Sequence, residues 1–279
     1  MQEYQYLKQT GNPEIHAALV GISKQDWICA KPHENTRDAI QIMGQYQFDI
    51  LPKLNKGAVI NSYYYTDQWG KYCKENIKTN IIEPADTIYY LTNIKDVIRM
   101  MFESSRNFYF LTNLSEVVGL ITISNLNCKH ISLYYYNMIN SLERKLGKFV
   151  HQQLDTIKIL GSLQKVGVEK NIQSSLDTVS RFKEDALKGM DGSIIEYLYL
   201  SDLFILISEH KLFRLLGYKK QDEFEKDSGK LKQIRNAIAH PNKSLVKGPE
   251  SLNDLWKSLV KINELDERLD INKIVVPNF

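Results

Sequence analysis

The 279-residue sequence predicts an α+β multidomain protein, with a pair of β-α-β-β-α repeats in residues 1–130 and an all-α helical bundle in residues 131–279. Two observations predict this division. The first half contains two stretches with the same order of a short amphipathic helix and two apolar strands. After about residue 130, apolar residues instead recur every three or four positions, which is the period of a helix. A hydrophobic content of 43% supplies enough apolar surface for two cores.

The repeats are expected at about 27–66 and 87–128. The pieces of the first are a helix at 36–43 and strands at 48–52 and 57–60. The pieces of the second are a helix at 94–101 and strands at 108–111 and 119–122. The offset between equivalent pieces grows from 58 to 62 residues, which indicates loops of different length. Neither repeat is expected to be stable alone, so the two should pack against each other.

The end of the second repeat carries polar groups suited to a nucleotide. The strand contains Gly119 and ends at Thr122, and Asn125 follows three residues later. If a helix begins near Thr122, its hydroxyl and free N–H groups suit a phosphate, and Asn125 could reach ribose hydroxyls. In the first repeat we align Ile60 and Tyr63 with these two positions, so at most one well-formed site is expected. Alternatively, Thr122 only caps a helix, and the repeats are a dimerisation scaffold.

The repeat and the string from Gly119 to Asn125 resemble a tandem pair of CBS domains. This resemblance implies a cleft that binds an adenine nucleotide as a regulatory ligand, with Thr122 and Asn125 handling phosphate and ribose.

The second half predicts a bundle of helices. They are expected at about 133–160, 172–187, 193–216 with a candidate break near Glu209, 224–239 and 251–269. We interpret 161–170 as a connection, and Gly217 as the C-cap of the third helix. The short apolar run at 274–276 should dock on the rest of the protein.

The string from Arg235 to Pro241 carries the chemistry of this half. His240 precedes Pro241, and a residue before proline is pushed out of the α region, so the helix should end there. Asn236 shares a helical face with His240, whereas Arg235 lies roughly 140° away around the axis. One copy therefore cannot bring Arg235 and His240 together unless His240 leaves the helix, but two copies across a symmetric interface could. A guanidinium can stabilise phosphate charge and an imidazole can transfer a proton, which suits RNA cleavage.

An all-helical domain with an Arg-Asn-x-x-x-His string resembles the HEPN superfamily over about 131–270. This resemblance implies a metal-independent endoribonuclease that acts as a homodimer on single-stranded RNA and leaves a 2′,3′-cyclic phosphate. Arg235 and His240 would be the catalytic pair, with Asn236 beside them, in an antiviral defence or toxin role. One alternative is a non-catalytic nucleotide-sensing regulator whose helical half dimerises or docks a partner. Another is a nucleotidyl- or phosphate-binding site for a toxin–antitoxin partner.

The HEPN resemblance also places an acidic residue on an upstream helix, and Asp202 is our assignment for it. This carboxylate lies in a mostly apolar segment, 198–205, where it would cost several kcal/mol if unpaired. Arg235 is the expected partner, with Lys and Arg residues elsewhere on the bundle as rivals, and a structural ion pair is favoured over a direct catalytic role. Glu196 is the alternative acidic residue.

The cysteines, the apolar runs and the charge distribution indicate where the protein is located and whether it binds a metal. Cys29, Cys73 and Cys128 are far apart, which predicts incidental thiols in a reducing compartment. The sequence shows no secretion signal and no apolar run free of charges, so we expect a cytoplasmic protein. No metal site is predicted. The whole net charge of +3 lies after residue 130, with an excess of basic residues in 211–235 beside the motif.

Overall fold

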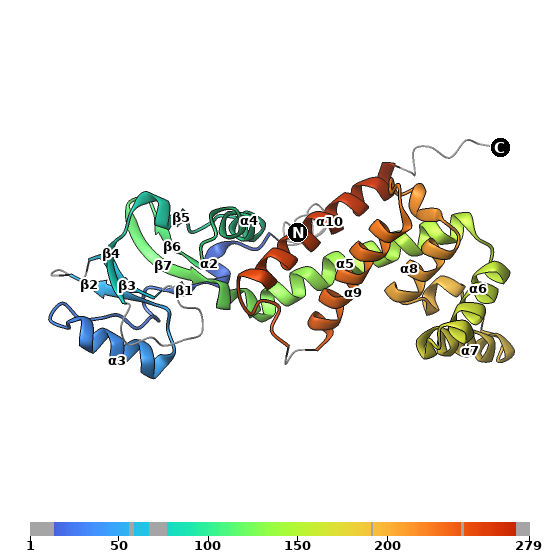
Figure 1. The fold of residues 1–279 in the computed structure, drawn as a ribbon, viewed down its shortest axis with the longest axis horizontal. Coiled ribbons are helices and arrows are strands. Elements are labelled where there is room, and N and C mark those ends of the chain that lie inside the picture. Colours follow the sequence, from blue (N-terminus) through green and yellow to red (C-terminus); the bar gives the residue numbers. More distant parts are fainter. Residues whose placement is uncertain (1–13, 56–58, 67–76, 191, 241–242, 272–279) are drawn as a thin grey trace, which may run out of the picture. The chain divides into compact units, whose positions relative to one another are not determined.

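The computed structural model describes residues 14–55, 59–66, 77–190, 192–240 and 243–271 (Figure 1). The chain forms two compact units, one of residues 1–131 with 246–253, the other of 132–245 with 254–279. In the described residues, no helix is both long and apolar enough to cross a bilayer.

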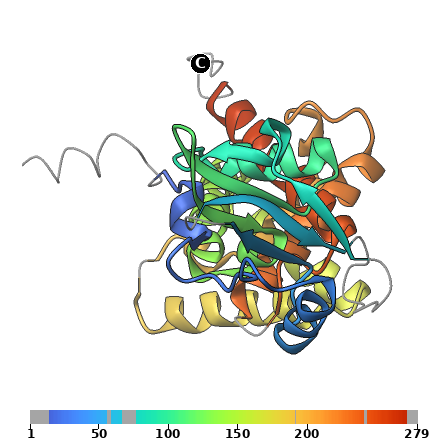
Figure 2. The same ribbon diagram turned by 90° about the vertical axis from the view of Figure 1, so that its left-hand side faces the viewer.

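The first unit contains two sheets. The strands of the larger sheet, in spatial order, are β1 (Ile22–Ser23), β7 (Glu116–Thr122), β6 (Phe108–Asn113) and β5 (Thr87–Tyr89). Those of the smaller sheet are β2 (Ile50–Leu54), β3 (Ile60–Tyr65) and β4 (Lys78–Ile81). Its helices are α2 (Ala17–Val20), α3 (Thr36–Tyr46), α4 (Ile94–Ser104) and two 3₁₀ turns, η1 (Pro84–Asp86) and η2 (Ile123–Asn127). Figure 2 shows the strands of this unit facing the viewer, with α3 in dark blue below them.

Side-chain caps define where the two longer helices of this unit begin. Asn35 accepts the N–H groups of Arg37 and Asp38, and the carboxylate of Asp38 accepts the N–H of Asn35 in return. Asn93 caps α4 by accepting the N–H of Lys95. These caps satisfy N–H groups that the first turn of a helix leaves without a partner.

The two repeats correspond at a nearly constant offset. α3 and α4 begin 58 residues apart, and so do β2 and β6. In the hairpins, Ile50 faces Tyr65 as Phe108 faces Thr122. The expected growth of the offset to 62 residues is therefore wrong, because the antiparallel register places Tyr65 opposite the start of its partner strand.

Each sheet is completed by a strand from outside its own repeat. β1, which precedes the first repeat, pairs with β7 through Ile22–Leu120 and Ser23–Gly119. β4, which precedes the second repeat, pairs with β3, with Ser62 opposite Ile81. The two repeats therefore exchange their leading strands, and neither sheet is complete without the other repeat.

Aromatic rings fill the contact between the two sheets. The ring centroid of Tyr63 on β3 lies 5.4 Å from that of Phe108 and 5.3 Å from that of Phe110 on β6. The Tyr63 hydroxyl donates a hydrogen bond to the buried carboxylate of Asp86 at 3.3 Å, and Asp86 also pairs with Arg106. Burial, reinforced by the Asp86 charge, raises the pKa of Tyr63 to about 12. The polar groups of this contact are thus paired rather than left unsatisfied.

A pair of hydrogen bonds explains why 246–253 groups with the first unit, although the sequence analysis placed it in the helical half. The side-chain amide of Asn127 donates to the carbonyl of Val246 at 2.8 Å, and the N–H of Val246 donates to Asn127 Oδ1 at 2.8 Å. The Val246 side chain is buried.

The second unit is helical, as the apolar period predicts. Its α-helices are α5 (Lys129–Gln153), α6 (Thr156–Glu169), α7 (Gln173–Leu187), α8 (Leu200–Glu209), α9 (Gln221–Ala239) and α10 (Pro249–Ile271), of which α5 and α10 begin in residues of the first unit. Two short 3₁₀ turns, η3 (Ile194–Tyr197) and η4 (Leu212–Arg214), flank α8.

Two of the expected helix boundaries are wrong. The first helix does not continue to residue 160, because Asp155 accepts the N–H of Lys158 at 2.8 Å and starts α6. The segment 161–170 is consequently helical in all but its last residue, rather than a connection. In the expected helix at 193–216, the break near Glu209 is confirmed, because α8 ends at Glu209 and a left-handed Lys211 follows before η4. The expectation is wrong before α8, where η3 and an extended Tyr199 interrupt the helix. Gly217 has a φ of +79°, which glycine tolerates best. The run 274–276 lies outside the described residues.

We expect Gly119→Ala to weaken the first unit. An added Cβ would lie 2.7 Å from the carbonyl oxygen of Ile22 on β1, so the exchanged strand would have to shift. The free energy of unfolding, measured by urea titration of the full chain, should fall by about 1–3 kcal/mol. Gly44→Ala is the matched control, because Gly44 lies within α3 with no atom near its Cβ position, and it should stabilise by about 0.5–1 kcal/mol. Equal effects of both changes would contradict the close approach of β1.

Candidate functional site

The motif lies at the C-terminal end of α9. This helix ends at Ala239, and His240 takes an extended conformation with φ −113° and ψ 94°, as predicted from the proline that follows. Pro241 itself lies outside the described residues. Arg235 is half-buried, whereas Asn236 and His240 are exposed.

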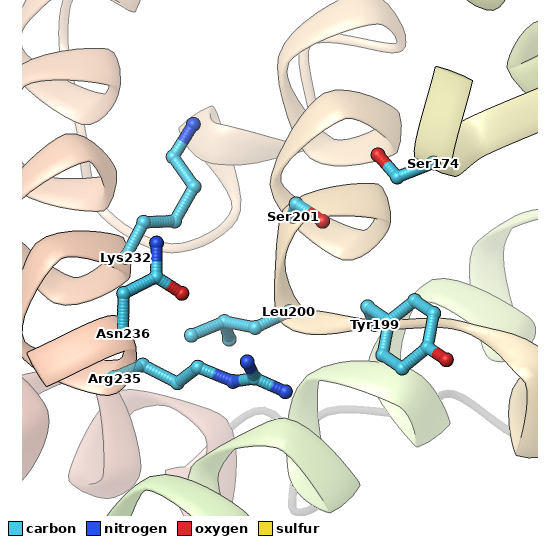
Figure 3. A pocket seen from close by; sticks show the side chains of 7 residues that line it. All are labelled: Ser174, Tyr199, Leu200, Ser201, Lys232, Arg235 and Asn236. Atoms are coloured by element: carbon cyan, nitrogen blue, oxygen red, sulfur yellow. The ribbon is translucent and has the colours of Figure 1, made fainter. Parts of the chain in front are cut away.

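A pocket of about 450 Å³ opens beside the motif within the helical unit (Figure 3). We call it the motif pocket, and it is lined by Ser174 of α7, by Tyr199, Leu200 and Ser201 at the start of α8, and by Lys232, Arg235 and Asn236 of α9. Figure 3 shows the side chain of Arg235 extending across the pocket toward Tyr199. The structure therefore brings Arg235 and Asn236 into one pocket. His240 is not among the described residues that line it.

The guanidinium of Arg235 is available to an anion. Among the described residues, its side chain forms no hydrogen bond and no ion pair within 4.0 Å. Arg235 interacts electrostatically with the carboxylate of Glu143 on α5. Burial raises the pKa of Glu143, while a hydrogen bond from the backbone of Leu200 and the charge of Arg235 act in the other direction. An arginine in this state suits a phosphate, because a guanidinium is always charged and donates two parallel hydrogen bonds.

Glu143 was not predicted from the sequence. Its position was visible in the helical pattern, because Glu143 directly follows Leu142 of the buried stripe that includes Ile139 and Leu146. An acidic residue that borders such a stripe is desolvated and needs positive charge or hydrogen-bond donors. Sequence alone does not show that Arg235, ninety-two positions later, supplies that charge.

Asp202 is fully buried, but the expected ion pair with Arg235 is wrong. Its carboxylate accepts hydrogen bonds from the hydroxyls of Ser175 at 2.8 Å and Thr178 at 3.0 Å, and from the N–H of Tyr199 at 3.1 Å. Burial raises the pKa of Asp202, and these bonds and the charge of Arg181 lower it. Three donors thus replace the expected cation. Asp202 ties α7 to the start of α8 and positions the pocket wall, whereas Glu196 lies exposed in η3.

Thr122 and Asn125 lie together at the end of β7, where they bind each other. The N–H and the hydroxyl of Thr122 both donate to Asn125 Oδ1, at 2.7 and 2.8 Å. This is the geometry of a cap on η2, which favours the alternative that Thr122 caps a helix. Gly119 has a separate structural role, because β1 approaches it too closely for a side chain.

In the first repeat, Ile60 and Tyr63 were predicted to be the counterparts of Thr122 and Asn125. This prediction is wrong. The N–H of Thr66 donates to the carbonyl of Asp49 just as that of Ile123 donates to Asn107, so Tyr65 corresponds to Thr122. The counterpart of Asn125 falls outside the described residues.

The environment of Cys29 disfavours its reactive thiolate form. Cys29 and Cys128 are half-buried, and Cys73 lies outside the described residues. Burial raises the pKa of Cys29 to about 11, so this thiol stays protonated at neutral pH. Within the described part of the chain, no three His, Cys, Asp or Glu side chains gather where they could hold a metal.

Comparison with known proteins gives structural likenesses only. No family model and no curated protein matches the chain. The chain is similar to a crystal structure of CBSX2 in complex with AMP, at 14% identity and a TM-score of 0.32, over 40% of this chain and 93% of that one. It is similar to an uncharacterised conserved protein from Pyrococcus horikoshii, at 18% identity and 0.32, over 40% and 89%. A third is the CBS domain of the bacterial CNNM/CorC family Mg²⁺ transporter, at 12% identity and 0.33, over 46% and 80%. These values assign no function to this chain.

We expect the free energy of unfolding to depend on pH through the buried carboxyl group of Asp202. Because burial raises its pKa, the folded chain holds the Asp202 proton more tightly than the unfolded chain does. The stability from this proton is complete below the ordinary aspartate pKa of about 3.9 and is lost as the pH rises through the raised value. Asp202→Asn has no carboxylate that could ionise at this position. As the pH rises from about 4 to 7, its free energy of unfolding should therefore increase relative to that of the parent chain.

Asp202→Ala provides the contrast. It leaves the donors of Ser175 and Tyr199 unpaired, at a cost of about 1–3 kcal/mol for each buried group. Urea titrations of the full chain at several pH values measure both variants. A difference between parent and Asp202→Asn that does not change with pH would contradict the raised pKa.

Proposed function

We propose that the protein is a metal-independent endoribonuclease of the HEPN type that acts as a homodimer on single-stranded RNA. The observation that carries this proposal is the guanidinium of Arg235, which extends into the motif pocket without a hydrogen-bond or ion-pair partner among the described residues. Lys232 adds a second cation and Asn236 an amide to the same pocket. Two cations and an amide suit a phosphodiester better than a neutral ligand.

The proposed reaction needs a proton acceptor, a proton donor and a stabiliser of phosphate charge. A base takes the proton of the ribose 2′-hydroxyl, whose oxygen attacks the neighbouring phosphorus. The bond from phosphorus to the 5′-oxygen breaks, and that oxygen receives a proton. The products are a 2′,3′-cyclic phosphate and a 5′-hydroxyl. Arg235 is assigned to the charge that develops on the phosphate, and His240 to proton transfer.

The position of His240 is the reason for proposing a dimer. His240 is exposed at the end of α9 and is not among the described residues that line the pocket of its own chain. A second copy could bring its own His240 to the Arg235 of the first. In a symmetric pair this contact would occur twice, because each surface meets its own copy.

We propose further that the first unit is a CBS-type pair that binds an adenine nucleotide and regulates cleavage, in a cytoplasmic defence or toxin system. The repeat of helix and hairpin and the exchange of leading strands support this assignment. The site would include Thr122 and Asn125, whose mutual hydrogen bonds a nucleotide would have to replace.

Cleavage of single-stranded RNA in the presence of EDTA tests the nuclease. Arg235→Ala and His240→Ala should each lower the rate by at least about 100-fold, because each removes a charge stabiliser or a proton-transfer group. Arg144→Ala and His151→Ala are the matched controls, since both residues are exposed on α5. Cleavage that survives in both motif variants would sink the proposal.

Mixing the two inactive variants tests the dimer. An Arg235→Ala chain paired with a His240→Ala chain contains one site with an intact Arg235 and an intact His240, so activity should partly return. If the mixture stays inactive although the chains exchange, the two groups act within one chain. No cleavage under any condition, with nucleotide binding retained, would favour a non-catalytic regulator.

Calorimetric titration of the full chain with AMP, ADP and ATP tests the regulatory site. Thr122→Val should weaken binding by at least about tenfold, because it removes one hydrogen bond to a charged group, and Thr122→Ser should retain it. If the parent chain binds none of the three nucleotides, the proposed regulatory site is wrong. Cleavage rates with and without the bound nucleotide measure the regulation.

A further inference from the structure

Tyr199 lines two pockets of the helical unit. One is the motif pocket (Figure 3). The other, of about 460 Å³, we call the neighbouring pocket, and it is lined by Ser174, Asp177, Ser180, Arg181, Glu184 and Tyr199. The two pockets share Ser174 and Tyr199, so they meet at this tyrosine ring. Each volume lies in the range of sites that hold small ligands.

The ring of Tyr199 is held in place yet accessible. The residue is 42% exposed, so part of it is open to a ligand. The guanidinium carbon of Arg181 lies 5.0 Å from the ring centroid, within range of a cation–π interaction. The bond that Tyr199 makes to Asp202 uses only its backbone N–H, so that bond does not require an aromatic side chain.

The charges around the ring differ between the two pockets. Lys232 and Arg235 face the motif pocket, whose described lining includes no carboxylate. The neighbouring pocket instead has Arg181 opposed by Asp177 and Glu184. A phosphate is therefore attracted to the motif pocket and repelled by the carboxylates of the other. A nucleotide with its phosphate beside Arg235 would share this pocket with Tyr199.

We propose that Tyr199, backed by Arg181, is a base-stacking subsite for single-stranded RNA. One base stacks on the tyrosine ring while the phosphate of the same strand contacts Arg235 and Lys232. The subsite rests on the proposed ribonuclease function, for which it positions the substrate. It also selects single strands, because the bases of a duplex are stacked on one another and cannot reach a side chain.

The test uses short 2′-O-methyl RNA that carries one 2-aminopurine, bound to the full chain in EDTA. The methyl group blocks attack by the 2′-oxygen, so binding is measured without cleavage. Stacking of 2-aminopurine lowers its fluorescence, and we expect this decrease with the parent chain and with Tyr199→Phe. Tyr199→Ala should abolish the decrease and raise the Kd by about 5- to 150-fold, the contribution of one stacked base. Tyr136→Ala, which removes another exposed tyrosine of the helical unit, should change neither.

The outcomes separate the subsite from the nuclease. An unchanged Kd and an unchanged fluorescence decrease in Tyr199→Ala would overturn the subsite, as would a parent chain that does not bind the RNA. Thermal unfolding of Tyr199→Ala checks that the variant is folded. If it is not folded, Tyr199→Phe still tests the subsite, because this variant retains the aromatic ring. Fluorescence loss with the parent chain but no cleavage of ordinary RNA would leave the subsite standing and refute the enzyme.

Discussion

Three hydrogen bonds converge on the buried carboxylate of Asp202, and the motif pocket depends on them. The hydroxyls of Ser175 and Thr178 come from α7, and the N–H of Tyr199 comes from the start of α8. A carboxylate without these donors would be costly in so apolar a place, and the donors without the carboxylate would be unsatisfied. The network therefore fixes the start of α8 against α7. Tyr199, Leu200 and Ser201, which line the pocket, follow from that position.

The same network leaves the guanidinium of Arg235 without an ion pair to Asp202. The carboxylate of Asp202 accepts its hydrogen bonds from donors on α7 and α8, so it forms no ion pair with Arg235. Glu143 influences Arg235 through charge, but the two form no ion pair within 4.0 Å among the described residues. A partly desolvated cation with no close partner is an expensive state for a purely structural residue. Such a state suits the anion-binding role that we propose for Arg235.

In the first unit, the constraint is the exchange of leading strands. β1 completes the sheet of the second repeat and β4 completes that of the first, so each repeat satisfies backbone groups of the other. Gly119 is needed where β1 passes, since a side chain there would meet the carbonyl of Ile22. Such mutual pairing makes a repeat pair fold as one unit, in which the end of β7 and the cap formed by Thr122 and Asn125 have defined positions.

Local features of this protein could be predicted from its sequence. The helical period of the second half, the end of α9 before Pro241 and the capping pattern at Thr122 and Asn125 depend on residues within a few positions of one another. Only the folded chain shows the partners of Asp202, the role of Glu143 and the register that makes Tyr65 the counterpart of Thr122. Many donors could satisfy a buried carboxylate, and a hairpin can pair in several registers. The choice between them is made by packing between segments far apart in the chain, which periodicity and spacing do not encode.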